Sequence, residues 1–149
     1  MSTVDKPDRK SWDTAALPVG EAKAVAVRQM FDTIAPRYDL VNRIMTFRLD
    51  VRWRRSTVAA LALGDGALVL DVASGTGDLC RELSRQRLQP LSCDFSFGML
   101  AADTSHAPRV QSDAQRLAIR TGGVDGITCG FALRNFVDLS ALFTELARV

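Results

Sequence analysis

The sequence predicts an α/β fold in which a parallel sheet follows a helical N-terminal part. Three observations carry this prediction. From residue 68 onward, short apolar strands alternate with helical segments, which is typical of parallel βαβ units. A glycine-rich turn at 73–77 lies between the first strand and the next helix. Acidic residues close the first three predicted strands, at the edge of the sheet where ligands bind.

Composition and spacing divide the chain into three parts. Residues 1–19 mix charged residues with Ser, Thr and Pro, so we expect a loose N-terminal segment. Residues 20–66 show the apolar spacing of helices, which we expect to cover the substrate side of the molecule. Residues 67–149 carry the alternating strands and helices, and we expect them to bind the ligand.

Three helices are expected in the N-terminal part. The first begins at Glu21, and Pro36 ends it or kinks the entry to the next. Its shared apolar face carries Val27, Met30, Phe31 and Ile34. The second helix spans 37–47, and the third runs from its N-cap, Asp50, to Ala62. The apolar anchors of this third helix are Val51, Trp53, Val58 and Leu61.

The α/β part is expected to hold four strands and three helices. The strands are predicted at residues 68–71, 91–94, 110–113 and 124–131. The helices are predicted at residues 78–86, 97–102 and 139–149. Asp138 precedes the last helix and is its expected N-cap.

Composition indicates an ordinary globular protein, with 47% hydrophobic and 24% charged residues. The net charge of +2 argues neither for nor against nucleic acid. We expect no secretory signal and no membrane span, because the first residues are polar and no apolar run approaches the roughly 20 residues that cross a bilayer. The three cysteines lie far apart without metal-ligand spacing, so we expect reduced thiols, no metal and a cytoplasmic location.

The glycine turn by itself fits a nicotinamide enzyme, a methyltransferase or a turn that binds nothing. Asp94 follows it by about twenty residues, the position that bonds the ribose hydroxyls of an adenosine cofactor. Asp71 places a carboxylate at the turn, and Cys80 stands where a dinucleotide motif has its third glycine. Both features favour a ligand with ammonium and sulfonium charges and no phosphate, which is S-adenosylmethionine (SAM).

Five segments carry a resemblance to a known family: residues 30–53, 70–78, 93–100, 112–119 and 127–138. They resemble the signatures of the C-methyltransferases of ubiquinone and menaquinone biosynthesis, of the demethylmenaquinone methyltransferase type. The family's N-terminal signature is matched at Tyr38, Asp39, Asn42 and Trp53. Val41, Thr46 and Asp50 stand where the family has Met, Ser and His.

The resemblance implies a Rossmann-like class I SAM-dependent methyltransferase fold with N-terminal helices, lacking the last strands of a seven-stranded sheet. It implies that residues 67–149 are the SAM-binding domain. It assigns the cofactor to a set of turn and strand-end residues, namely Asp71, Gly75, Thr76, Gly77, Asp94, Asp113, Ala114 and Gly130. The implied catalytic residues are Arg134, Asn135 and Tyr38, which would stabilise a phenolate and help to remove a proton.

The implied reaction is C-methylation of a polyprenyl quinol, most closely demethylmenaquinol to menaquinol. We expect the chain alone to be inactive or weak, because the substrate side is incomplete. A homodimer and peripheral contact with a membrane are further hypotheses, and no nucleic-acid partner is expected. The alternatives are a non-catalytic cofactor-binding remnant and a methyltransferase acting on another small molecule or on nucleic acid.

Overall fold

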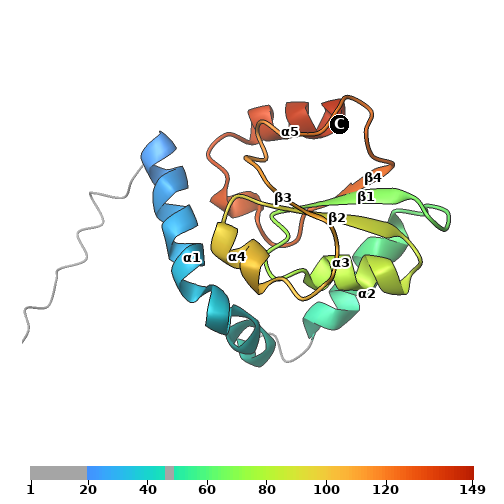
Figure 1. The fold of residues 1–149 in the computed structure, drawn as a ribbon, viewed down its shortest axis with the longest axis horizontal. Helices are drawn as coiled ribbons and strands as arrows, with labels where there is room; N and C mark the ends of the chain where they lie inside the picture. The colour runs from blue at the N-terminus through green and yellow to red at the C-terminus, as the bar shows by residue number, and fades with distance from the viewer. Residues whose placement is uncertain (1–19, 46–48) are drawn as a thin grey trace, which may run out of the picture.

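The computed structural model describes residues 20–45 and 49–149, with the backbone alone for residues 36–45, 49 and 50. A four-stranded parallel sheet forms its centre, in the order β3-β2-β1-β4 (Figure 1). The strands are β1 Leu68–Val72, β2 Gln89–Asp94, β3 Arg109–Gln111 and β4 Gly126–Thr128. The predicted α/β class and the parallel sheet are therefore confirmed.

Helices cover both faces of the sheet. In Figure 1, α5 (Leu139–Arg148) lies above the sheet, and α2 (Leu49–Ala60) and α3 (Asp78–Arg85) lie below it. Helix α1 (Gly20–Met45) stands at one end of the sheet, beside α4 (Phe97–Ala102). A short 3-10 helix, η2 (Leu133–Asn135), precedes α5. Loops at the carboxyl ends of the strands therefore lie next to α1.

Strand β1 supplies both halves of the core, because successive side chains of a strand point to opposite faces. Leu70 and Val72 pack in the cluster that includes Leu142 of α5. Val69 packs in the opposite cluster with Leu83 of α3. Asp71 is two residues after Val69, so its side chain lies on the same face of the sheet and points toward α3.

Several sequence predictions agree closely with the structure. Helix α3 begins at Asp78 and α4 at Phe97, as expected. Asp138 caps α5, since its carboxylate accepts a hydrogen bond of 3.0 Å from the backbone N–H of Ala141. These features depend on local signals of capping and apolar spacing.

The N-terminal prediction of three helices was wrong. Residues 20–45 form the single helix α1, so Pro36 does not end it. A proline removes one helical hydrogen bond, and the bonds on either side keep the helix continuous here. Helix α2 begins at Leu49, which places Asp50 inside its first turn instead of at the N-cap.

The fourth strand is also shorter than the predicted 124–131. It pairs with β1 only over Gly126–Thr128. Phe131 has a φ of 59°, a left-handed conformation that no strand accommodates, so the chain turns across the strand ends. The third strand ends at Gln111, and Asp113 lies in the turn after it.

No helix among the described residues combines the length and apolarity needed to cross a membrane.

Candidate functional site

Two cavities meet at the glycine turn that follows β1. The larger, about 150 Å³, lies toward β2 and includes Asp94, and we call it the Asp94 cavity. The smaller, about 70 Å³, lies toward α2 and includes Asp71, and we call it the Asp71 cavity. The two share four lining residues, which are Ala73, Gly75, Gly130 and Phe131. One elongated ligand could therefore occupy both cavities across the turn.

Asp71 is the most deeply buried carboxylate at the strand ends, with only 1% of its surface exposed. The Thr128 hydroxyl donates to its Oδ1 at 2.7 Å, and the Cys80 thiol donates to its Oδ2 at 3.6 Å. Burial raises the pKa of Asp71 to about 7, against the two hydrogen bonds, which lower it. Burial also raises the pKa of the Cys80 thiol, so it stays protonated and donates. A cationic ligand at this carboxylate would favour its ionised form.

Asp94 is half-buried at the end of β2 and is held by backbone groups. The N–H of Gly75 donates to Oδ2 and the N–H of Ser96 to Oδ1, each at 2.8 Å. Burial raises the pKa of the Asp94 carboxyl, and these backbone hydrogen bonds oppose the rise. The bond from Gly75 ties the glycine turn directly to the strand-end acid. Because Asp94 also lines its cavity, the carboxylate is placed to accept ligand hydroxyls.

The glycine turn adopts a backbone that other residues would strain. Gly75 and Gly77 have φ angles of 56° and 83°. A Cβ at Gly77 would overlap the Asp103 carboxylate and come within 2.8 Å of the Ser105 Cβ. Gly77 therefore allows the turn to lie directly on the segment after α4.

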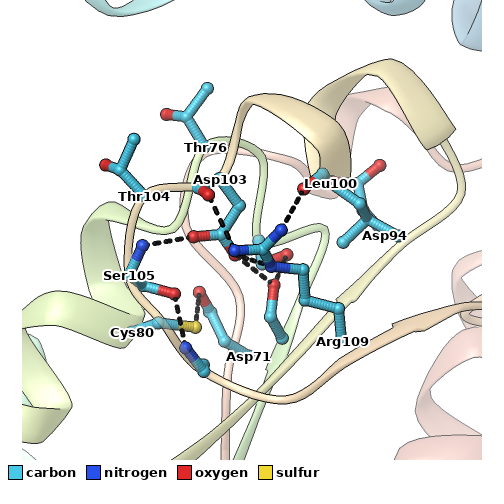
Figure 2. Close-up of polar contacts among 12 residues, drawn as sticks. Asp71, Thr76, Cys80, Asp94, Leu100, Asp103, Thr104, Ser105 and Arg109 are labelled. Atoms are coloured by element: carbon cyan, nitrogen blue, oxygen red, sulfur yellow. Dashed lines mark hydrogen bonds and ion pairs between the residues drawn. The ribbon is translucent and has the colours of Figure 1, made fainter.

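The buried Asp103 carboxylate lies at the centre of a set of polar contacts that support the glycine turn (Figure 2). Its Oδ1 accepts the N–H of Ser105 at 2.6 Å, and its Oδ2 accepts the hydroxyl of Ser92 at 2.8 Å. Ser92 in turn bonds the Ser74 hydroxyl of the glycine turn at 2.7 Å. Arg109 lies 3.9 Å from the carboxylate and donates to the Asp103 carbonyl. No local pattern in the sequence predicts this support, because its members come from four separate segments.

The predicted cofactor residues mostly line these cavities. Those in the Asp71 cavity are Asp71, Gly75, Thr76 and Gly130. Those in the Asp94 cavity are Gly75, Asp94, Asp113, Ala114 and Gly130. Gly77 lines neither and acts through the backbone of the turn. The sequence-based grouping therefore corresponds to one continuous region of the structure.

The predicted catalytic residues differ in their placement. Asn135 lines the Asp94 cavity. Arg134 is exposed on η2 and is not among the residues lining either cavity. The side chain of Tyr38 lies outside the described residues. The catalytic roles of all three stay predictions.

Helix α1 contributes a wall of the Asp94 cavity that the sequence did not predict. Its lining residues are Ala24, Val27, Arg28 and Phe31. The expected common apolar face is divided, because Met30 and Ile34 are exposed while Val27 and Phe31 face the cavity. Helical spacing identified an apolar face but could not distinguish core packing from cavity lining.

Helix α2 closes the Asp71 cavity from the other side. Arg54 lines it and pairs with Asp78 of α3 at 2.8 Å. Trp53 was predicted as a packed anchor, but it is 48% exposed and contacts the Phe131 ring at a centroid distance of 5.9 Å. Val58 is the anchor that is buried. Within the described ranges, no group of three or more potential metal ligands is present.

Sequence comparisons give a consistent result. A family model described as the ubiE/COQ5 methyltransferase family matches residues 18–149. Demethylmenaquinone methyltransferases from Mycolicibacterium paratuberculosis and Mycolicibacterium gilvum are 43% and 45% identical to the chain over 124 residues. Each match covers 83% of this chain and 54% of the relative. The chain therefore spans about half the length of the curated relatives it matches.

Solved structures share the fold. A putative methyltransferase from an antibiotic biosynthesis pathway of Anabaena variabilis has a TM-score of 0.63 at 26% identity, covering 66% of this chain and 41% of that one. Magnesium protoporphyrin IX methyltransferase from Synechocystis, solved with bound SAM, has a TM-score of 0.69 at 19% identity. That match covers 87% of this chain and 72% of the other. The sheet described above is thus the strand arrangement of class I methyltransferases.

Proposed function

Because the chain belongs to the ubiE/COQ5 methyltransferase family, we propose that it binds SAM for the C-methylation of a polyprenyl quinol. The substrate we favour is demethylmenaquinol, because the matched relatives carry the name demethylmenaquinone methyltransferase. In this proposal residues 67–149 supply the carboxylates and the turn that bind the cofactor, while residues 20–66 add walls to both cavities and cover the substrate side.

The observation that carries the proposal is the pair of carboxylates on either side of Gly75. Asp71 lies in one cavity and Asp94 in the other, and both cavities reach the glycine turn. SAM has an ammonium and a sulfonium at one end and ribose hydroxyls toward the other. Asp71 suits the cationic end, and Asp94 suits the ribose, since charge-assisted hydrogen bonds contribute about 1.5–3 kcal/mol each. Asp113 and Ala114 would then border the adenine.

When bound, SAM supplies an electrophilic methyl group to a ring carbon of the quinol. The residues of η2 would stabilise the quinol oxygen as its proton is lost, which makes the neighbouring ring carbon nucleophilic. Asn135 borders the Asp94 cavity, and Arg134 precedes it with an exposed guanidinium. Exposed Phe131 lies just before η2 and exposed Leu133 begins it, and both suit an apolar ring and tail. Tyr38 is proposed to complete the pocket from α1.

The proposal extends to contact with a membrane, where a quinol with an isoprenoid tail resides. Exposed Arg52 and Arg55 on α2 offer positive charge to anionic lipid. Sedimentation with neutral and with anionic vesicles tests this contact, and equal sedimentation with both would contradict it. Light scattering of the purified chain tests the proposed homodimer.

Binding is the primary test of function, since the chain spans about half the length of its relatives. We expect saturable binding of S-adenosylhomocysteine (SAH) in calorimetry, with one molecule per chain. Methyl transfer is then measured by mass spectrometry with reduced demethylmenaquinol, a reduced benzoquinol and the oxidised quinones as controls. A folded chain by circular dichroism that binds no SAH would contradict the proposal. If the chain shows turnover, Arg134→Ala separates an enzyme from a pure binder, because methyl transfer should decrease while SAH affinity stays at the parental value.

A further inference from the structure

Asp32 of α1 makes an unusual set of contacts with the start of α4. Its Oδ1 accepts the Ser96 hydroxyl at 2.5 Å and the backbone N–H of Gly98 at 2.9 Å. Arg28, one turn earlier on α1, lies 3.8 Å from the other carboxylate oxygen. The hydrogen bonds from Ser96 and Gly98 keep the pKa of the Asp32 carboxyl below its usual value. The group is therefore an ionised acceptor at neutral pH.

The backbone of α1 rests directly on α4 at this point. A Cβ at Gly98 would lie 2.9 Å from the Cα of Asp32 and 3.2 Å from its carbonyl oxygen. Real Cβ atoms do not tolerate such approaches to backbone, so a larger residue would push α1 away. Glycine at position 98 is thus required by the packing of the two helices.

Ser96 connects this contact to the strand-end acid. Its N–H donates to Asp94 Oδ1 at 2.8 Å, and its hydroxyl accepts the N–H of Met99 at 3.1 Å as the cap of α4. The hydroxyl of Ser96 has one proton, which it donates to Asp32, and the Ser96 side chain is almost fully buried. Asp94 then accepts the N–H of Gly75 through its second oxygen. A continuous chain of hydrogen bonds thus runs from α1 to the glycine turn.

The same helix forms one wall of the Asp94 cavity. Val27, Arg28 and Phe31 line it, and the Arg28 guanidinium lies 5.4 Å from the centre of the Phe95 ring. From these contacts we infer that Asp32 is a positioning residue, which docks α1 over the Asp94 cavity and fixes Asp94 through Ser96. Asp32 itself does not line the cavity. The inference rests on the proposed cofactor for its functional consequence, but the coupling itself concerns the chain alone.

Hydrogen exchange of the ligand-free chain by NMR tests the coupling. In Asp32→Ala, the amides of Gly75 and Ser96 should exchange about tenfold faster, because the carboxylate that accepts them is no longer held. The amide of Gly66 donates to the Arg87 carbonyl at 2.8 Å at the amino ends of β1 and β2, the opposite edge of the sheet from Asp94, and should exchange as in the parent. Equal acceleration of all three amides would mean that Asp32 only stabilises the fold, and would overturn the inference. So would no acceleration at Gly75 and Ser96.

Calorimetry with SAH tests the functional consequence in the same variants. Asp32→Ala and Gly98→Ala should each weaken SAH binding about tenfold at unchanged stoichiometry, while Asp32→Asn, which keeps an acceptor oxygen, should weaken it less. Glu21→Ala removes an exposed acid from the first turn of the same helix and should bind SAH as the parent does. Parental affinity in both Asp32→Ala and Gly98→Ala would overturn the inference and leave the proposed function intact. If the parent binds no SAH but the exchange result holds, the proposed function fails and the positioning role stands.

Discussion

Asp71 and Asp94 lie near the ends of neighbouring strands, yet different parts of the chain hold their carboxylates. Asp71 is enclosed by the α/β core and accepts side-chain donors from α3 and β4. Asp94 accepts two backbone N–H groups from turns, one of which, that of Ser96, is fixed by α1. Burial raises the pKa of both carboxyls; the hydrogen bonds that oppose the rise come from core side chains at Asp71 and, at Asp94, from backbone N–H groups that the N-terminal helix supports.

The core and the N-terminal helices therefore act on different carboxylates of the site. The core sets the protonation of Asp71, because burial is the largest influence on its pKa. Helix α1 sets the position of Asp94 and lines its cavity. Substitutions in the two regions should therefore differ in kind: those at Asp71 should alter pH dependence, and those around Asp94 should alter affinity at every pH.

The largest effect is expected for Asp94→Ala. The variant loses the hydrogen bonds proposed for the ribose and leaves the N–H groups of Gly75 and Ser96 without their acceptor. We expect SAH affinity to fall about 100-fold or more, since two charge-assisted hydrogen bonds are removed. Calorimetry measures the change, with Asp65→Ala as a control, because Asp65 is exposed and pairs only at the surface with Arg87. A loss below about threefold would remove Asp94 from the cofactor site.

Asp71→Asn should have the next largest effect on SAH affinity, and it should also stabilise the fold at pH 8. The amide keeps the shape of the side chain but cannot balance a ligand ammonium, so we expect SAH affinity to fall about 10–100-fold. The free energy of unfolding at pH 8 should increase, because a buried carboxylate no longer has to ionise. Calorimetry measures the SAH affinity, and thermal melts on the same sample measure the stability. A variant that loses stability as well as affinity would contradict the assigned role.

The two carboxylates also differ in how far local sequence predicted them. Asp71, the glycine turn and the start of α3 at Asp78 were recognisable because strand, turn and helix signals are contiguous. Asp94 was recognised by its distance from the turn. The bond between Ser96 and Asp32, however, joins residues 64 positions apart, and nothing in either segment specifies the other. Support for the site is thus harder to predict than the site, because it depends on tertiary packing.

Local signals were also the source of the errors in the N-terminal part. Pro36 and Asp50 carry strong local signals for a helix end and a helix start, and the structure follows neither. Helix α1 continues past Pro36 because a proline removes only one helical hydrogen bond, a loss that the rest of a 26-residue helix can absorb. The short β4 is a comparable case, because the left-handed Phe131 has no signature in an apolar run.

The pH dependence of stability should reflect Asp71. Its pKa is raised from 3.8 to about 7 in the folded chain, so the folded state holds a proton that the unfolded state releases above about pH 4. The contribution of Asp71 to the free energy of unfolding is therefore fully present below about pH 4 and is lost as pH rises through about 7. Thermal melts across this range should show the decline in the parent and a flatter profile in Asp71→Asn. Parallel profiles would mean that Asp71 is ionised throughout.

The smallest effect, and the sharpest test of the comparison, is expected for Thr128→Val. Valine keeps the shape of the β4 side chain and removes the hydroxyl that donates to Asp71 at 2.7 Å. A hydrogen bond to a charged group contributes about 1.5–3 kcal/mol, so the pKa of Asp71 should rise by about one unit. Since the ammonium of SAH favours the ionised carboxylate, SAH affinity in the parent should increase with pH through about 7 and then level off.

Thr128→Val should move the midpoint of that affinity profile upward by about one pH unit and leave the affinity on the high-pH plateau close to that of the parent. Thr144→Val makes the same chemical change at an exposed position of α5, where the hydroxyl donates to the Ser140 carbonyl. It should leave the midpoint unchanged. Asp94→Ala should lower the whole profile at every pH, because Asp94 acts through hydrogen bonds to the ligand. A Thr128→Val profile that falls uniformly would mean that both carboxylates act only as hydrogen-bond acceptors, and the distinction between core and helix would fail.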